Sequence, residues 1–263
     1  MKSQVFNNNN DTDRSELLSS GAFIAKVFLY MFLGLLISAL VCVSLSALLV
    51  NAIGVGDESF LGLYLTLMIV SLLGLLVTSF IISIKRIRMK SILVPYLFYV
   101  VFMGVLMSSF VYYVENPYII GISLAITSLI FLITCFSALI FKGRIGWLLG
   151  LLFGGILTMG VLSLVNLFLF PWAFHVQSAF DASLTIYWII EAIFVLMIII
   201  STFIDMYNLK KIASYGGDNS NLALYYSMNL YSDFIMLFIR ILYFVMVIFG
   251  RGGSGTKNNF KNF

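Results

Sequence analysis

Charged side chains are scarce in this sequence, and their scarcity excludes an ordinary soluble domain. Only 10% of the 263 residues are Asp, Glu, Lys or Arg, whereas 62% are hydrophobic and the mean hydropathy is +1.08. A soluble domain carries about 25% charged residues, which water can solvate at its surface. We therefore expect an integral membrane protein in contact with the lipid bilayer. The net charge of +4 is typical of basic cytoplasmic helix ends, and we expect no nucleic-acid partner.

Several residue types that specific chemistries require are rare or misplaced. The two cysteines, Cys42 and Cys135, lie far apart in apolar runs, which excludes a disulfide framework and a Cys-x-x-Cys metal site. The single histidine, His175, falls in a predicted loop, which excludes an intramembrane Ser/His protease. The last apolar run has no lysine for a retinal Schiff base, and the chain has no P-loop. We expect no enzyme and no cofactor, which leaves a channel, leak, transporter or membrane scaffold.

Seven apolar stretches are each long enough to cross a bilayer, whose core of about 30 Å needs about 20 helical residues. They are residues 23–50, 59–84, 91–114, 118–141, 147–170, 182–206 and 229–249. The predicted fold class is an all-α integral membrane protein with a seven-transmembrane-helix domain over residues 23–250. Residues 1–22 are expected to form a disordered cytosolic tail, and residues 251–263 a flexible polar tail.

The distribution of basic residues predicts that the N-terminus is cytoplasmic. Lys and Arg occur in the N-terminal flank and in the loops after the second, fourth and sixth spans, whereas the other three loops contain none. Basic residues mark the cytoplasmic side of a membrane protein. Seven crossings then put the C-terminus outside, although its Arg251, Lys257 and Lys261 favour the opposite side. A six-span alternative with a re-entrant last segment would place this tail inside.

Ionisable residues inside the predicted spans are few, and each is a functional candidate because an unpaired charge in a bilayer is costly. Asp205 lies near the inner end of the sixth span, and Asp233 lies about one turn into the seventh. A cytoplasmic loop joins these antiparallel spans, so we expect the two carboxylates at similar depth. Such a pair titrates as a unit and could sense protons. When ionised, it could bind a hard cation through its oxygen atoms.

Three further charged residues extend this picture. Arg86, at the inner end of the second span, is a candidate counter-charge for the pair, although Lys85 and Arg88 could serve equally, or all three could face lipid headgroups. Glu191 precedes Asp205 by fourteen residues, and Arg240 follows Asp233 by seven. At 3.6 residues per turn, each of these residues lies near the same helix face as the aspartate of its own span. Two interpretations stay open, namely a polar track through the bundle and a structural contact between Glu191 and Arg240.

Three stretches of the sequence carry recognisable motifs. Residues 223–242 read ALYYSMNLYSDFIMLFIRIL, residues 204–212 read IDMYNLKKI, and residues 23–40 read FIAKVFLYMFLGLLISAL. They resemble, in that order, the A-L-x-L-Y-L-D-F-I-N-L-F-L-x-L-L-R signature, the Y-D-x-x-x-I end of the sixth span, and the F-x-x-K-V-Y-x-x-M-x-x-G-L-x-I-T-A start of bacterial members of the Bax inhibitor family. Ser232 and Met236 depart from the signature, and Arg240 stands earlier in the chain than the signature's arginine.

The resemblance implies a seven-helix bundle with the last helix central and a pH-sensitive cation leak. The expected ion is Ca²⁺, and the gate is an aspartate pair at the cytoplasmic mouth. Matched position by position, that pair is Asp205 and Asp233, which would bind Ca²⁺ transiently, and the latching arginine is Arg86. The expected location is a bacterial plasma membrane. Glu191 has no counterpart in these motifs.

Two functions of other classes stay open at this point. A membrane interaction protein would bind a protease or another membrane protein and conduct nothing. A proton-coupled secondary transporter would use Glu191, Asp205 and Asp233 as a relay. A leak dissipates an ion gradient without a co-substrate, whereas a transporter shows saturable, coupled exchange and a scaffold shows neither.

Overall fold

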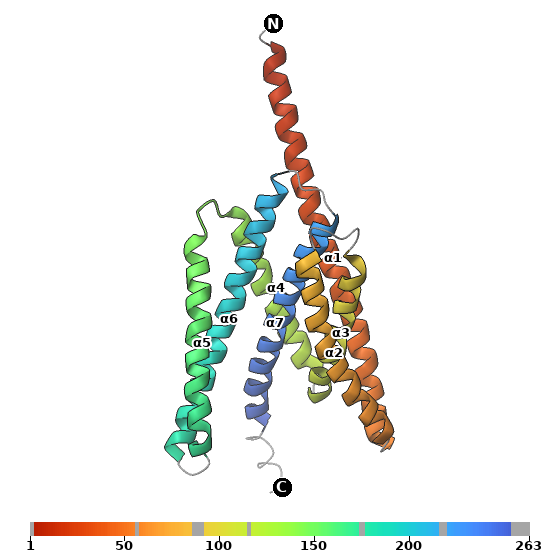
Figure 1. The fold of residues 1–263 in the computed structure, drawn as a ribbon, viewed down its shortest axis with the longest axis vertical. Helices are drawn as coiled ribbons and strands as arrows, with labels where there is room; N and C mark the ends of the chain where they lie inside the picture. Colours follow the sequence, from red (N-terminus) through yellow and green to blue (C-terminus); the bar gives the residue numbers. More distant parts are fainter. Residues whose placement is uncertain are drawn as a thin grey trace, which may run out of the picture. The chain divides into compact units, whose positions relative to one another are not determined.

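The computed structural model describes residues 3–55, 58–85, 92–114, 117–173, 177–215 and 220–253. Its regular elements are helices, and seven of them in the described ranges are long and apolar enough to cross a membrane (Figure 1). They are α1 (Ser3–Val55), α2 (Glu58–Lys85), α3 (Leu93–Tyr113), α4 (Pro117–Ile140), α5 (Gly146–Ala173), α6 (Gln177–Ala213) and α7 (Ser220–Gly253). The predicted fold class, an all-α protein with seven transmembrane helices, is therefore confirmed.

Two helices are longer than the sequence predicted. Helix α1 begins at Ser3, within the tail expected over residues 1–22, because that segment is polar but contains no proline. Helix α7 begins at Ser220 instead of residue 229. Hydropathy reports which residues suit the bilayer, whereas the hydrogen bonds of a helix can continue beyond the apolar stretch into polar residues. The cytosolic placement of the first segment stays a prediction, and residues 254–263 lie outside the described residues.

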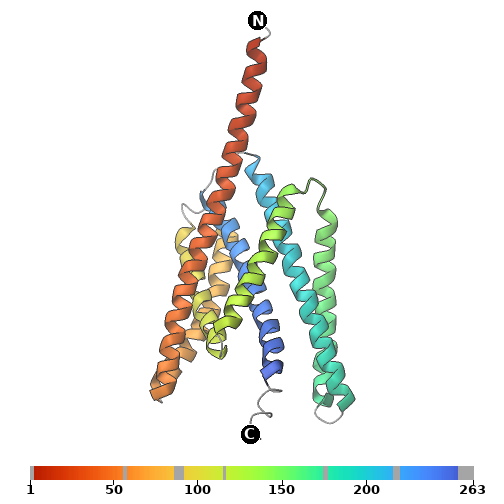
Figure 2. The same cartoon turned by 180° about the vertical axis from the view of Figure 1, so that it is seen from behind.

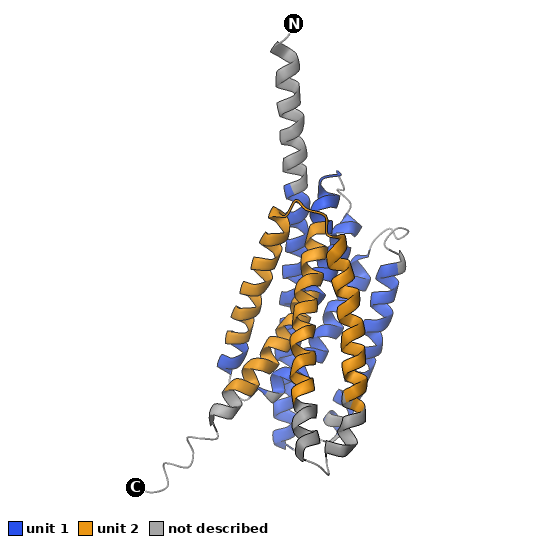
Figure 3. Cartoon of the chain, turned by 90° about the vertical axis from the view of Figure 1, so that its left-hand side faces the viewer, with its two compact units in different colours: residues 1–121, 208–232 blue, residues 122–207, 233–263 orange. Residues whose placement is uncertain are grey.

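The chain divides into two compact units, coloured separately in Figure 3. Unit 1 consists of residues 1–121 and 208–232, and unit 2 consists of residues 122–207 and 233–263. Helix α7 therefore contributes its first part to unit 1 and its remainder to unit 2. Its span, Ser220–Ile248, has the largest buried share of the seven.

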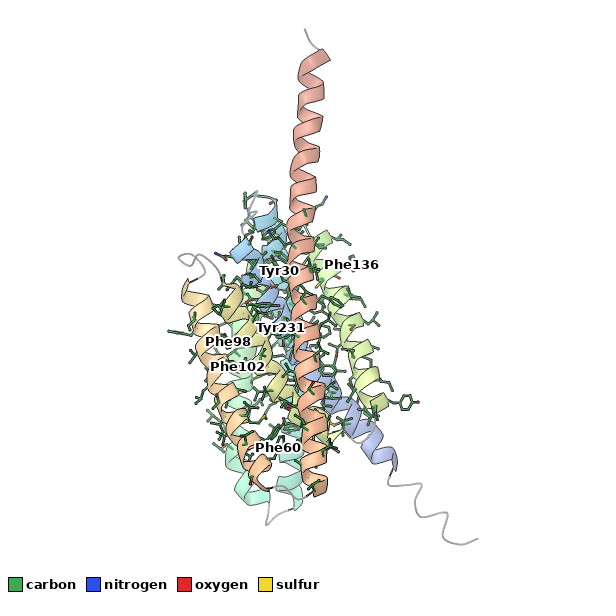
Figure 4. All side chains as sticks on the ribbon, turned by 90° about the vertical axis from the view of Figure 1, so that its right-hand side faces the viewer. Tyr30, Phe60, Phe98, Phe102, Phe136 and Tyr231 are labelled. Atoms are coloured by element: carbon green, nitrogen blue, oxygen red, sulfur yellow. The ribbon has the colours of Figure 1, made fainter. Side chains whose placement is uncertain are left out.

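In unit 1, α3 packs against both α1 and α2 (Figures 1 and 2). Gly34 of α1 lies against Tyr96 and Val100 of α3, and the Tyr96 hydroxyl donates a hydrogen bond to the carbonyl oxygen of Tyr30 at 2.8 Å. On the other side of α3, Phe102 lies one turn after Phe98 (Figure 4), and its ring covers Gly74 of α2. Glycines thus let the α3 aromatic side chains approach neighbouring backbones closely.

Buried hydroxyl groups also join the helices of unit 1. Ser108 of α3 donates to the Val105 carbonyl at 2.6 Å, so the Tyr64 hydroxyl of α2, 2.9 Å away, donates to Ser108. Ser46 of α1 contacts the Ser108 carbonyl oxygen at 3.2 Å. Near the end of the unit, Tyr99 contacts the Ser232 hydroxyl at 2.6 Å and packs edge-on against Tyr231 (Figure 4).

Gly104→Val should destabilise the protein, because Gly104 of α3 sits directly on the backbone of α1. A Cβ atom at Gly104 would lie 2.8 Å from the Ser38 carbonyl oxygen and 2.9 Å from the Val41 Cβ, so α1 would have to move. Overpacking of this kind costs about 1–3 kcal/mol. Thermal unfolding in detergent measures the effect. Gly150→Val in α5 is the matched control, since a Cβ atom there meets nothing within 4 Å; equal melting temperatures for the two variants would contradict the prediction.

In unit 2, α6 contacts α5, the second part of α7 and Phe141, which directly follows α4. Met197 of α6 lies over Gly155 of α5, and the two helices run side by side in Figures 1 and 2. Phe141, directly after α4, packs edge-on against Phe203 of α6 at 5.5 Å between ring centroids. Trp188 of α6 stacks at a tilt on Phe244 of α7 at 5.5 Å. These contacts surround α6, which carries two of the ionisable candidates.

Candidate functional site

Asp233, the first residue of α7 that belongs to unit 2, is a buried carboxyl group with an unused oxygen. Its side chain is 4% exposed, and its Oδ2 atom has no hydrogen-bond partner in the described structure. The hydroxyl groups of Ser201 and Thr202 on α6 face the carboxyl. Thr202 already donates to the Ile198 carbonyl at 2.9 Å, so it does not satisfy the carboxyl fully. An incompletely bonded carboxyl inside a membrane-spanning segment is energetically costly.

Asp205 lies within electrostatic range of this group. It stands on α6, about one turn after Ser201 and Thr202, and it acts directly on Asp233 through its charge. Both aspartates belong to unit 2, and Asp205 lies about one helical turn beyond the two hydroxyl residues that face Asp233. A direct or water-mediated hydrogen bond between the two aspartates stays a prediction.

Helix α4 closes this neighbourhood from another side, which sequence reasoning missed. Phe131 packs edge-on against Phe234 at 5.4 Å between ring centroids, and Cys135, one turn later, interacts electrostatically with Asp233. Cys135 is 3% exposed. Its place beside a carboxyl could not be read from the sequence, because no pattern in the fourth span identifies its partner helix.

Glu191 and Arg240 form an ion pair within unit 2. The Nη1 atom of Arg240 donates to the Glu191 Oε1 atom at 2.5 Å, while the Glu191 Oε2 atom is buried without a hydrogen-bond partner in the described structure. The guanidinium carbon also lies 4.2 Å from the centroid of the Phe194 ring, a cation–π contact. Of the two interpretations left open by the sequence, the contact between these residues is therefore present.

Arg86 lies outside the described residues, as do Arg88 and Lys90. Its predicted role as counter-charge to the aspartates stays a prediction. Helix α2 ends at Lys85, immediately before Arg86 in the sequence.

The aspartate neighbourhood can hold a cation only loosely with the groups present. Among the described residues, no cluster of three or more His, Cys, Asp or Glu side chains could hold a metal ion. Ca²⁺ takes six to eight oxygen ligands, so Asp205 and Asp233 would need water and neighbouring hydroxyl or carbonyl oxygens to complete a shell.

Comparison with known proteins agrees with this architecture. The model of the family described as Inhibitor of apoptosis-promoting Bax1 matches residues 21–251, which include all seven candidate membrane spans and both aspartates. Neither the curated proteins nor the solved structures compared with the chain give a match. The family match covers most of the chain and agrees with the motifs quoted above. The chain is therefore an integral membrane protein that belongs to the Bax inhibitor family.

Proposed function

We propose that this protein is a pH-sensitive cation leak, with Ca²⁺ as the transported ion and Asp205 and Asp233 as its gate. The observation that carries the proposal is the buried Asp233 carboxyl, which has an unused oxygen and a second carboxyl in electrostatic range. Membership of the Bax inhibitor family supports it, since the family resemblance implies such a leak. The proposal needs no cofactor and no catalytic residue.

The chemistry of the pair explains how protons could regulate cation passage. Two close carboxylates repel each other, so they take up protons as a coupled unit. When both are ionised, they attract a divalent cation, and when they share a proton, they attract it less. The loose ligand set favours passage, because a conducting site must bind an ion weakly enough to release it.

Purified protein in liposomes should pass Ca²⁺ down its gradient without a co-substrate, and the rate should change with pH. The measurement is entry of Ca²⁺ into vesicles loaded with a fluorescent indicator, compared with protein-free vesicles. Saturable flux that requires a counter-transported proton gradient would favour the proton-coupled transporter. Absence of flux at every pH would contradict the leak and favour a membrane interaction protein that binds a protease or another membrane partner.

A further inference from the structure

The Glu191–Arg240 ion pair has features that a purely structural pair does not require. Glu191 is 4% exposed, yet only one of its two carboxylate oxygens is bonded. A guanidinium can bind both oxygens of a carboxylate at once, and a buried pair gains from doing so. Here the contact with Arg240 uses one, and the Oε2 atom is buried beside the Tyr187 side chain without a hydrogen-bond partner of its own among the described residues.

The pair also lies in line with the two aspartates. Along α7, Arg240 follows Asp233 by seven residues, about 10 Å and nearly the same face. Along α6, Glu191 precedes Asp205 by fourteen residues, about 21 Å and within about 40° of the same face. All four residues belong to unit 2. On the predicted orientation, Glu191 and Arg240 are the outer members of this row of charges.

We infer that Glu191 is a second binding residue for a hard divalent cation, and that Arg240 occupies it as a tethered cation until an entering ion displaces it. This inference rests on the proposed leak and adds an outer site to it. An arginine charge and a divalent cation compete for the same carboxylate, so the resting pair holds the outer site closed. The unbonded Oε2 atom, buried in the resting pair, would give a cation that reaches it a first ligand before Arg240 leaves.

Phe194 provides a place for the displaced arginine. The Arg240 guanidinium already lies over this ring, and its side chain is 33% exposed, so it is not enclosed by the carboxylate alone. A cation over an aromatic face keeps part of its stabilisation when it loses its anion. Arg240 can therefore release Glu191 without becoming an unpaired charge in an apolar environment, which lowers the cost of opening.

Single neutral substitutions should change cation passage in opposite directions. Arg240→Gln leaves the Glu191 carboxylate without its competitor, so Ca²⁺ flux should rise by about tenfold. Glu191→Gln leaves the arginine charge without its anion, so an approaching cation is repelled and flux should fall by about tenfold. If the pair is only a structural contact, both substitutions remove the same bond, and flux should follow the amount of folded protein in the same direction for both.

Binding of Mn²⁺ provides a measurement that does not depend on conduction. Purified variants are prepared with Asp205→Asn and Asp233→Asn as background, which removes the other candidate site, and free Mn²⁺ is followed by electron paramagnetic resonance. Arg240→Gln should add a binding site, and Glu191→Gln should not. Arg14→Gln and Glu16→Gln are the matched controls, because they remove the same charges from the segment before the first span.

The two experiments separate this inference from the proposed function. A wild type without Ca²⁺ flux contradicts the leak, while the Mn²⁺ measurement still decides whether Glu191 binds a cation. The outer site alone is overturned by a second result. In it the wild type conducts, both single variants shift the Ca²⁺ flux in the same direction, and Arg240→Gln gains no Mn²⁺ binding site. Melting temperatures of each variant show whether a lost signal reflects unfolding. The double variant Glu191→Arg with Arg240→Glu exchanges the two charges and should restore the stability that either single variant loses.

Discussion

Asp233→Asn is expected to remove most of the pH dependence of Ca²⁺ flux and to lower the flux itself by about tenfold. The amide has nearly the same shape as the carboxyl, so packing of Phe234 against Phe131 should be retained. It neither ionises nor repels Asp205, and therefore no coupled proton uptake remains. Flux measured in liposomes between about pH 5 and pH 8 tests this, because carboxyl pairs and histidines that act as physiological sensors titrate in that range.

The same measurement on other carboxyl variants serves as a control. Asp205→Asn should behave like Asp233→Asn, since either substitution leaves only one ionisable carboxyl group of the pair. Glu16→Gln, in the segment before the first span, should leave the pH profile unchanged. A pH midpoint in Asp233→Asn equal to that of the wild type would show that the pair does not sense protons, even if the protein conducts.

The direction of the pH response distinguishes two closed states. If a proton shared by Asp205 and Asp233 bonds α6 to α7, flux should rise as pH rises and the pair ionises. If Arg86 holds the ionised pair, protonation weakens this attraction, and flux should rise as pH falls. A single profile of the wild type therefore indicates whether a shared proton or an arginine keeps the inner mouth closed.

Arg86→Ala is expected to raise the resting leak by about tenfold and to shift its pH midpoint if Arg86 latches the aspartates, because an opposite charge within about 4–6 Å favours the ionised carboxylates. Arg88→Ala is the matched comparison, since it removes the same charge from the same loop. It should change little if Arg88 faces lipid headgroups. Equal flux and equal midpoints for the two variants would leave Arg86 as a topology signal only.

The fold could be predicted from the sequence because a bilayer imposes simple requirements. Each span must be apolar over about 20 residues, and polar clusters such as the one after Phe141 interrupt the pattern. The start of the last helix was less well predicted, because hydropathy placed it at residue 229, whereas α7 begins at Ser220. Hydropathy does not fix how far two helices slide past each other.

The contacts of the site depended on tertiary packing and so were only partly predictable. Helical spacing placed Glu191 and Arg240 on the faces of their aspartates, but their contact also requires a particular rotation of α6 against α7. Phe194 over Arg240 and Cys135 beside Asp233 arise from the same packing. A single sequence gives periodicity within each helix, and the pairing of faces between helices is decided by side-chain fit.

The Glu191–Arg240 pair also has a consequence for biosynthesis. Glu191 is synthesised 49 residues before Arg240, so α6 leaves the ribosome with its buried acid while the base that neutralises it has not yet been made. Many serine and threonine hydroxyls in other helices bond to a carbonyl of their own helix, as Ser38, Thr78 and Thr127 do, and these segments can enter the lipid singly. Helix α6 cannot do so at equal cost. The insertion machinery is therefore expected to retain it until α7 emerges and to release the two as a hairpin.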